Sequence, residues 1–163
     1  MIKLKQKLSI QETAKFSDFL RYLFIIINEG LWGWTWYVFV VRIFGGKNST
    51  LIIIKIKNKI IGGFFITNFP LAKYKLYNWF NIKIRMKIKE LVKKEYQYFC
   101  CFVIKKFFRN NGIGTFVFES YFKSKHKKIW FTSSPKAINF YLRNGAKLFY
   151  KSKYNIYVFN GQN

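Results

Sequence analysis

Two apolar runs in the first half of the chain have the composition of β-strands. Residues 51–56 and 60–67 are rich in isoleucine and phenylalanine, and Asn58-Lys59 lies between them. This short break predicts a tight hairpin, because asparagine tolerates the backbone angles that such turns require. Gly62-Gly63 interrupts the second run, which indicates a bulge or a close approach by neighbouring backbone.

The pattern before this hairpin predicts a helix. Apolar residues recur at helical spacing from about residue 10 to residue 27. Ser9 and Glu12 have the spacing of a capping box, in which the serine caps the first turn and the glutamate reaches back to its amide. The next stretch, residues 29–36, holds two glycines and three tryptophans, and it predicts a turn or a second short helix.

The third quarter of the chain contains the most apolar strand. Residues 82–91 fit either one element or a strand followed by a helix. The run YQYFCCFVI at 96–104 is continuously apolar, which is typical of a central strand that is buried on both faces. The polar stretch RNNGIG, residues 109–114, then separates this strand from a helical pattern at 115–122.

The last part of the chain has clear start and stop signals. A short strand at 129–132 leads to Ser134-Pro135, an N-cap followed by proline at the first helical position. Asn144-Gly145 is a typical helix end, and residues 147–151 and 155–159 predict a closing pair of strands. The order of these elements predicts a mixed α/β domain.

The composition predicts one folded domain with a strongly positive field. The chain has 163 residues, of which 51% are hydrophobic, so intrinsic disorder is not expected. It carries 30 lysines and arginines against 6 acidic residues, a net charge of +24. This charge would attract phosphates, nucleic acid or an anionic membrane surface, although an AT-rich genome would also enrich the chain in lysine, asparagine and isoleucine.

The sequence contains no pattern for export, a membrane span or a metal site. The apolar region at 20–44 is interrupted by polar residues and glycines, so no run reaches the roughly 18–20 residues of a spanning helix. Residues 1–7 alternate charged and apolar positions, unlike a signal peptide. The adjacent pair Cys100 and Cys101 suits neither a mutual disulfide nor a metal site. We therefore expect a cytoplasmic protein, monomeric or homodimeric, with reduced thiols.

The glycine turn at 109–114 has the form of a phosphate-binding loop. The first amides of a helix lack internal partners and carry the positive end of the dipole, and glycines let a phosphate approach them. A P-loop is excluded because no Lys-Ser or Lys-Thr follows the glycines, and Val117 stands where a dinucleotide fingerprint needs glycine. The pattern Arg-x-x-Gly-x-Gly, however, fits at Arg109, Gly112 and Gly114.

Two segments together resemble the GCN5-related N-acetyltransferase (GNAT) superfamily. VIKKFFRNNGIG at 103–114 is similar to the family's acyl-CoA pyrophosphate loop, and AINFYLRNGAKL at 137–148 is similar to its tyrosine-bearing segment, with Ala137, Tyr141 and Gly145 at matching positions. The resemblance implies an α/β (α+β) fold: a mixed, mostly antiparallel central sheet flanked by helices, with its two central strands splayed apart.

The resemblance also implies acetyl-CoA as co-substrate and a role for each matching residue. The central strand would pair with the pantetheine arm, and the loop amides would hold the pyrophosphate. Tyr141 would protonate the leaving thiolate as a general acid, or else be a core aromatic of an amphipathic helix. The implied acetyl-CoA-binding residues are Phe102, Val103, Ile104, Arg109, Asn110, Asn111, Gly112, Ile113, Gly114, Thr115, Ser134 and Ala137.

The sequence departs from the family pattern at two points. Ser134 stands where the family often has asparagine. Many members carry a glutamate as general base on the central strand or the next one, but neither strand contains a carboxylate here. Glu95, directly before the central strand, is the nearest candidate for a catalytic base. It could equally be a solvated charge, with Tyr98 or an ordered water as the base, and His126 lies in a lysine-rich link and is expected at the surface.

The resemblance implies transfer of an acetyl group to the primary amine of a small molecule. Glu29, Trp32, Trp34, Trp36 and Tyr37 lie where the family builds its acceptor site, and they could form an aromatic wall or a core. The positive charge disfavours polycationic acceptors and suits an amino sugar, in particular a nucleotide-linked one. Two alternatives stay open: a non-catalytic nucleic-acid-binding module and a CoA-binding GNAT fold without turnover.

Overall fold

The computed structural model describes residues 7–45, 48–68, 82–153 and 155–161. Its strands are β1 (Leu8–Thr13), β2 (Ser49–Ile56), β3 (Lys59–Thr67), β4 (Gln97–Ile104), β5 (Lys128–Thr132), β6 (Lys147–Tyr150) and β7 (Ile156–Asn160). Its helices are α2 (Phe16–Asn28), α3 (Trp32–Gly45), α4 (Ile82–Lys93), α5 (Ile113–Val117), which continues into a π-helical turn at Phe118–Lys123, and α6 (Pro135–Arg143).

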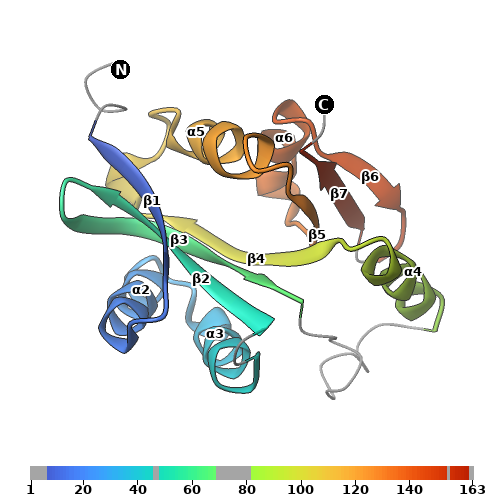
Figure 1. Cartoon of the computed structure of the whole chain (residues 1–163), viewed down its shortest axis with the longest axis horizontal. Coiled ribbons are helices and arrows are strands. Elements are labelled where there is room, and N and C mark those ends of the chain that lie inside the picture. Colours follow the sequence, from blue (N-terminus) through green and yellow to red (C-terminus); the bar gives the residue numbers. More distant parts are fainter. Residues whose placement is uncertain (1–6, 46–47, 69–81, 154, 162–163) are drawn as a thin grey trace.

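The strands of this part of the chain form one seven-stranded sheet, in the order β1-β2-β3-β4-β5-β7-β6 (Figure 1). Neighbours are antiparallel except β4 and β5, which are parallel. The pairing of β4 with β5 is limited to Gln97 opposite Ile129 and Tyr98 opposite Trp130. The predicted α/β fold, with a mostly antiparallel sheet, a central β4 and splayed central strands, is therefore confirmed.

Helices α2, α3 and α4 pack on one face of the sheet, and α5 and α6 pack on the other (Figure 1). Phe64 and Phe65 are neighbours on β3 and point to opposite faces, as strand geometry requires. The Phe65 ring packs against Tyr22 of α2, with ring centroids 5.9 Å apart. The Phe64 ring packs against Phe122 in the π-helical turn after α5, at 5.3 Å. The high aromatic content is thus used for two cores, one on each side of the sheet.

The hairpin of β2 and β3 forms as predicted, with its turn one residue earlier than expected, at Lys57-Asn58. Both glycines of β3 permit close backbone contact. A Cβ at Gly62 would overlap the carbonyl oxygen of Val103, and a Cβ at Gly63 would lie 2.6 Å from the carbonyl oxygen of Ile52. The paired glycines are therefore a packing requirement of the sheet centre.

The predicted capping box at Ser9 and Glu12 is wrong. Both residues lie on β1, which pairs antiparallel with β2, and α2 begins only at Phe16. The segment has alternating burial, since Leu8 and Ile10 are half-buried while their neighbours are exposed. Pairing with a distant strand satisfies the backbone of this segment, so it overrides the local helical signal.

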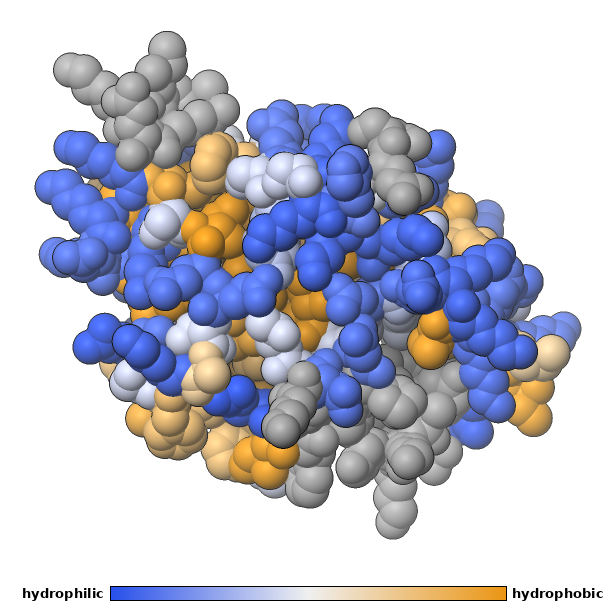
Figure 2. All heavy atoms as spheres, in the orientation of Figure 1, coloured by the Kyte–Doolittle hydropathy of each residue, from blue (hydrophilic) through white to orange (hydrophobic). Residues whose placement is uncertain are grey.

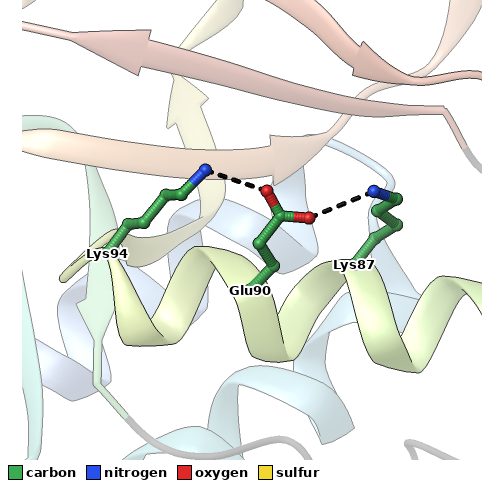
Figure 3. Close-up of polar contacts among 3 residues, drawn as sticks. All are labelled: Lys87, Glu90 and Lys94. Atoms are coloured by element: carbon green, nitrogen blue, oxygen red, sulfur yellow. Dashed lines mark hydrogen bonds and ion pairs between the residues drawn. The ribbon is translucent and has the colours of Figure 1, made fainter.

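Residues 82–91, which the sequence left ambiguous, lie within the single helix α4. Ile84, Ile88 and Leu91 form its buried face. On the outer face, Glu90 accepts hydrogen bonds from Lys94 at 2.9 Å and from Lys87 at 3.1 Å (Figure 3). These bonds, that from Lys94 first, lower the pKa of Glu90 from its usual value. Among the described helices, none is both long and apolar enough to cross a bilayer.

Candidate functional site

Strand β4 carries a bulge close to the point where it leaves β5. Its register with β3 shifts between Gly63 and Phe65, so β4 accommodates one extra residue there. Cys101, within this bulge, has a φ of 58°, which is uncommon for a residue other than glycine. The buried hydroxyl of Tyr22 donates a hydrogen bond to the Cys101 carbonyl oxygen and so fixes the bulge from α2. No local pattern indicated this contact, because the two residues are distant in the chain.

The edge of β4 that faces β5 is open over most of its length. Pairing along this edge ends at Tyr98 opposite Trp130, whereas β4 continues to Ile104. Backbone groups beyond Tyr98 therefore lie beside a gap between two parallel strands. An extended ligand with amide groups can pair with such an edge as an added strand does.

The RNNGIG loop connects β4 to α5 through two left-handed residues. Asn110 has a φ of 62° and Gly112 a φ of 72°, which explains why asparagine and glycine stand at these positions. The Asn111 side chain donates to the Arg109 carbonyl oxygen at 3.1 Å. The first helical bond of α5 runs from the Phe116 amide to the Gly112 carbonyl oxygen. The amides of the three residues before Phe116 have no acceptor among the described residues, so they can bind an anion.

A cavity of about 620 Å³ lies between this loop, the end of β4 and α6. Its basic residues are Arg109, Lys136 and Arg143, and no carboxylate lines it. The predicted acetyl-CoA-binding residues that line it are Phe102, Ile104, Arg109, Asn110, Gly112, Ile113, Gly114, Thr115 and Ala137. Two regions that are far apart in sequence, the loop and α6, thus form one basic cavity.

A second cavity, of about 270 Å³, lies between the splayed strands and the α2–α3 turn. Predicted residues Val103 and Ser134 line this cavity instead of the first. Its polar groups include the hydroxyls of Tyr98, Thr132 and Ser133, and none of the described residues that line it is charged. Its walls are completed by side chains from the α2–α3 turn and α3, Leu31 and Trp34 among them. The cavity therefore suits a small, uncharged and hydroxyl-bearing group.

Both cavities are lined by Phe102, Ala137 and Tyr141. The cavities therefore meet where β4 and β5 separate. Tyr141 packs its ring against Phe131 at 4.5 Å, and its hydroxyl has no hydrogen-bond partner among the described residues. Burial, with a smaller contribution from Cys101, raises the pKa of Tyr141 above its ordinary range. Tyr141 is thus a protonated phenol at neutral pH, positioned between the two cavities.

Arg109 is held by contacts within the protein. Its guanidinium forms an ion pair with Glu29, at the end of α2, and donates to the Ile104 carbonyl oxygen at 2.8 Å. Glu29 also accepts from the Lys106 amide at 2.8 Å. Arg109 therefore orients the loop as well as adding charge to the cavity. The sequence placed Glu29 only in the acceptor region, and it offered no signal for this pairing.

Several residues singled out in the sequence line neither of these two cavities. Glu95 is exposed in the turn before β4, with a φ of 64°, and Asn111 stabilises the loop from outside the cavity. Of the three tryptophans at 29–36, only Trp34 lines the second cavity, whereas Trp32 and Trp36 are exposed on α3.

None of the described residues that line the two cavities carries a carboxylate, so the glutamate base of many family members has no counterpart among them. Tyr98 is poorly suited to this role because burial raises its pKa above the ordinary range. Ser134 has the backbone angles of an N-cap, but its side chain makes no capping bond with the described residues. Its hydroxyl is therefore free to contact a ligand in the second cavity.

The basic cavity fits an acyl-CoA by its own geometry. The open edge of β4 matches the amide-containing arm, and the unpaired loop amides with the nearby cations match a pyrophosphate. Gly112 has no atom within 4 Å of the position of a Cβ, so it leaves the loop open to a ligand. Gly114 serves a different purpose, because a Cβ there would lie 2.7 Å from the Phe140 ring. It permits the close packing of α5 against α6.

No protein-family model and no curated protein matches this sequence. Solved structures, however, share its fold. FeeM, an N-acyl amino acid synthase from uncultured soil microbes, superposes with a TM-score of 0.64 at 11% identity, over 94% of this chain and 90% of FeeM. A Desulfovibrio desulfuricans structure described as a GNAT-family acetyltransferase gives 0.59 at 10% identity, over 94% and 99%. Spermidine N-acetyltransferase from Vibrio cholerae, solved with CoA and spermine, gives 0.58 at 10% identity, over 96% of each chain.

These comparisons establish the architecture. The chain has the fold of the GCN5-related N-acetyltransferase superfamily, as its two motifs predicted. At such low identities the likeness concerns the fold alone, so activity and substrate have to be argued from the site.

Proposed function

We propose that this protein is an acyl-CoA-dependent N-acetyltransferase that transfers an acetyl group from acetyl-CoA to the primary amine of a small molecule. The observation that carries the proposal is the meeting of two cavities at Tyr141, one basic and beside a phosphate-type loop, the other uncharged. This arrangement provides one cavity for a phosphorylated donor and another for an amine acceptor. A fold relative that is named as a spermidine N-acetyltransferase supports the same reaction class.

Different residues bind different parts of the donor. Acetyl-CoA, when bound, supplies the acetyl group as a thioester. The unpaired amides of Ile113, Gly114 and Thr115 bind its pyrophosphate, with Lys136 and Arg143 adding positive charge. The open edge of Phe102–Ile104 pairs with the extended pantetheine arm and orients the thioester toward the point where β4 and β5 separate.

Tyr141 acts as the general acid. The acceptor amine attacks the thioester carbonyl carbon, an amide bond forms and the carbon–sulfur bond breaks. The leaving thiolate takes a proton from the Tyr141 hydroxyl, which is free of other partners among the described residues. The raised pKa of Tyr141 means that its hydroxyl carries this proton at neutral pH.

The acceptor amine must lose a proton during the reaction. Glu95 is the carboxylate that the sequence nominated for this step, and we retain it as part of the proposal. Since Glu95 is exposed and lines neither cavity, it would act only through intervening water. An acceptor that enters as the neutral amine needs no base.

The second cavity favours an acceptor with hydroxyl groups. Its hydroxyl side chains offer hydrogen bonds, and Trp34 provides an aromatic surface on which a sugar ring can stack. No carboxylate is present to hold a polycation, which argues against a polyamine as acceptor. We therefore propose an amino sugar, in particular a nucleotide-linked amino sugar, whose phosphates would suit the net charge of +24.

Thermal stabilisation by acetyl-CoA tests this proposal. A ligand that binds only the folded state raises Tm in proportion to the logarithm of its concentration above Kd. We expect a rise for the full chain and for Gly30→Val, and none for Gly112→Val. The two glycines are matched, because both have a left-handed φ, of 74° and 72°, and open space around the Cβ position. Absence of a shift in the well-folded full chain would refute the proposal.

A CoA-binding fold without turnover is the second candidate. The observation that favours it is the absence of a carboxylate from the walls of both cavities. A screen of small amines, with release of free thiol as the readout, separates the two. Acetyl-CoA binding with amine-dependent thiol release supports the enzyme, and binding without release from any amine of the screen supports the second candidate.

A further inference from the structure

The outer side of helices α2 and α3 exposes large apolar side chains. We name this surface the α2–α3 face, and its members share one helical side on each helix. They are Phe16, Leu20 and Phe24 on α2, and Trp32, Trp36 and Ile43 on α3. Figure 2 shows hydrophobic surface gathered at the lower edge of the molecule, where Figure 1 places these two helices.

This exposure is large for side chains of this kind. Trp36 is 71% exposed, Trp32 66% and Phe24 64%. Single exposed apolar residues are ordinary on a protein surface, but a contiguous group on adjacent helices marks an interaction site. The two helices are fixed side by side, because Arg42 of α3 donates to the Ala14 carbonyl oxygen just before α2, at 2.6 Å.

Positive charge borders the same face. A cavity of about 490 Å³ has Leu20 and Phe24 in its wall together with the cations Arg21, Lys59 and Lys105. The combination of an apolar wall and a basic rim fits an amphiphile with an anionic head.

The acidic residues of these helices do not offset that charge. Asp18 is buried and accepts a hydrogen bond from Thr13 at 2.8 Å, and Glu29 is engaged by Arg109. Helices α2 and α3 contain no other acidic residue. The face is therefore apolar and cationic together.

We propose that the α2–α3 face docks on the surface of an anionic phospholipid bilayer. Tryptophan and phenylalanine are favoured at the boundary between headgroups and acyl chains, and cations at the rim would contact the phosphates. Anionic lipid also suits the net charge of +24, whereas a second copy of the chain would bring equal charge against it. Nucleic acid would use ring stacking and phosphate contacts, for which aliphatic Leu20 and Ile43 offer nothing. Docking of this kind is independent of the proposed acetyl transfer.

Vesicle co-sedimentation of the full chain tests the proposal. The probes are vesicles of phosphatidylcholine with phosphatidylglycerol and vesicles of phosphatidylcholine alone. We expect binding to the mixed vesicles only. The apolar variant is Trp32→Ser with Trp36→Ser, and its matched control is Ile82→Ser with Met86→Ser, an equally spaced pair on α4 that is 72% and 67% exposed. The apolar variant should lower the vesicle partition coefficient about tenfold or more, and the control should not.

A second pair of variants tests the charges. Arg21→Gln with Lys59→Gln removes two cations beside the face, and Lys83→Gln with Lys89→Gln removes two exposed cations from α4. Each cation near an anionic membrane adds about 1 kcal/mol of attraction, or about fivefold, so we expect about a thirtyfold loss for the first pair and a small one for the second. Equal losses in both pairs would show diffuse attraction by the whole chain and overturn the proposal.

Two further results would also overturn it. One is retention of full vesicle binding by the tryptophan variant. The other is a chain that does not bind vesicles but dimerises in sedimentation velocity or binds RNA through this face. Dimerisation or RNA binding would assign the α2–α3 face to a different occupant.

Discussion

Glu29 and Arg109 lie 80 positions apart in the sequence and form an ion pair that joins the end of α2 to the phosphate-type loop. The same carboxylate accepts from the Lys106 amide, so one side chain fixes two points of the loop. The α2–α3 turn, which borders the second cavity, is thereby connected to the loop that borders the first. Arg109, which the sequence nominated as a phosphate ligand, positions the loop through this contact.

Replacing Glu29 by glutamine is expected to weaken acetyl-CoA binding. The amide keeps the shape of the side chain but loses the charge-assisted bonds to the loop, which are worth about 1 kcal/mol, or about fivefold in Kd. Isothermal titration calorimetry measures the change. Glu90→Gln is the control, since it removes an exposed pair of hydrogen bonds on α4 (Figure 3) and should leave Kd unchanged. Tighter binding by Glu29→Gln would instead show that the carboxylate competes with phosphate for Arg109.

Tyr141→Phe is expected to lower kcat about 100-fold with little change in the Kd of acetyl-CoA. Loss of a general acid commonly costs a factor of this order or more. The ring contacts, such as that with Phe131, are retained, and the missing hydroxyl has no partner among the described residues, so Tm should change little. Stopped-flow thiol release and calorimetry separate the two effects. An unchanged kcat would show that Tyr141 is a core aromatic and not the general acid.

The pH profile should show no loss of Tyr141 function near pH 10. Burial raises the pKa of Tyr141, so its phenol stays protonated at pH values where an exposed tyrosine ionises. The raised pKa also means that protonation of Tyr141 contributes to the stability of the folded protein. This contribution is fully present below the pKa of the tyrosine in the unfolded chain, and it is lost as pH rises through its pKa in the folded protein. Kinetics of the full chain above pH 9, compared with its unfolding monitored by circular dichroism, test this. A basic limb at the ordinary tyrosine pKa in a folded protein would contradict it.

The acidic limb of the profile should follow the acceptor. With no carboxylate in either cavity, the neutral fraction of the amine controls the rate at low pH. For a series of amines, the midpoint of kcat/KM should therefore move with the pKa of each amine. Glu95→Gln tests the water-mediated base. A fixed midpoint that disappears in this variant would establish Glu95 as the base, whereas a moving midpoint in both proteins would exclude it.

Tyr22→Phe is expected to destabilise the fold by about 1–3 kcal/mol. The change leaves the carbonyl oxygen of Cys101 without its buried donor, and an unsatisfied buried group has a cost of this order. Urea unfolding measures the loss. Tyr150→Phe is the control, because Tyr150 is only half-buried, at the end of β6. Equal stability of the two variants would show that the bulge does not depend on Tyr22.

Much of the fold could be read from local patterns. The hairpin of β2 and β3, the continuous apolar strand β4 and the capped helix α6 each carry their signal within about ten residues. The bounds of β1 could not be read in this way. Its backbone is satisfied only by β2, more than 35 residues later, and the local pattern imitated a capping box.

The same distinction between local patterns and long-range contacts applies to the candidate site. The loop motif and the tyrosine spacing were visible in the sequence, because an anion-binding turn and a helix need particular residues at short, set distances. Which tryptophan of 29–36 borders a cavity was not visible, since the helical phase of α3 and its packing on the sheet place Trp34, which is 45% exposed, at the cavity, while Trp32 and Trp36 are more exposed.

The sequence by itself determined those elements, and the anion-binding loop, whose residues are neighbours both in the chain and in space. The tertiary structure alone decided that the loop is held by Glu29, that two cavities meet at Tyr141 and that Glu95 stands apart from both. Those relations join residues from separate elements. Their distances depend on how the sheet splays and how helices pack across it, which no local pattern encodes.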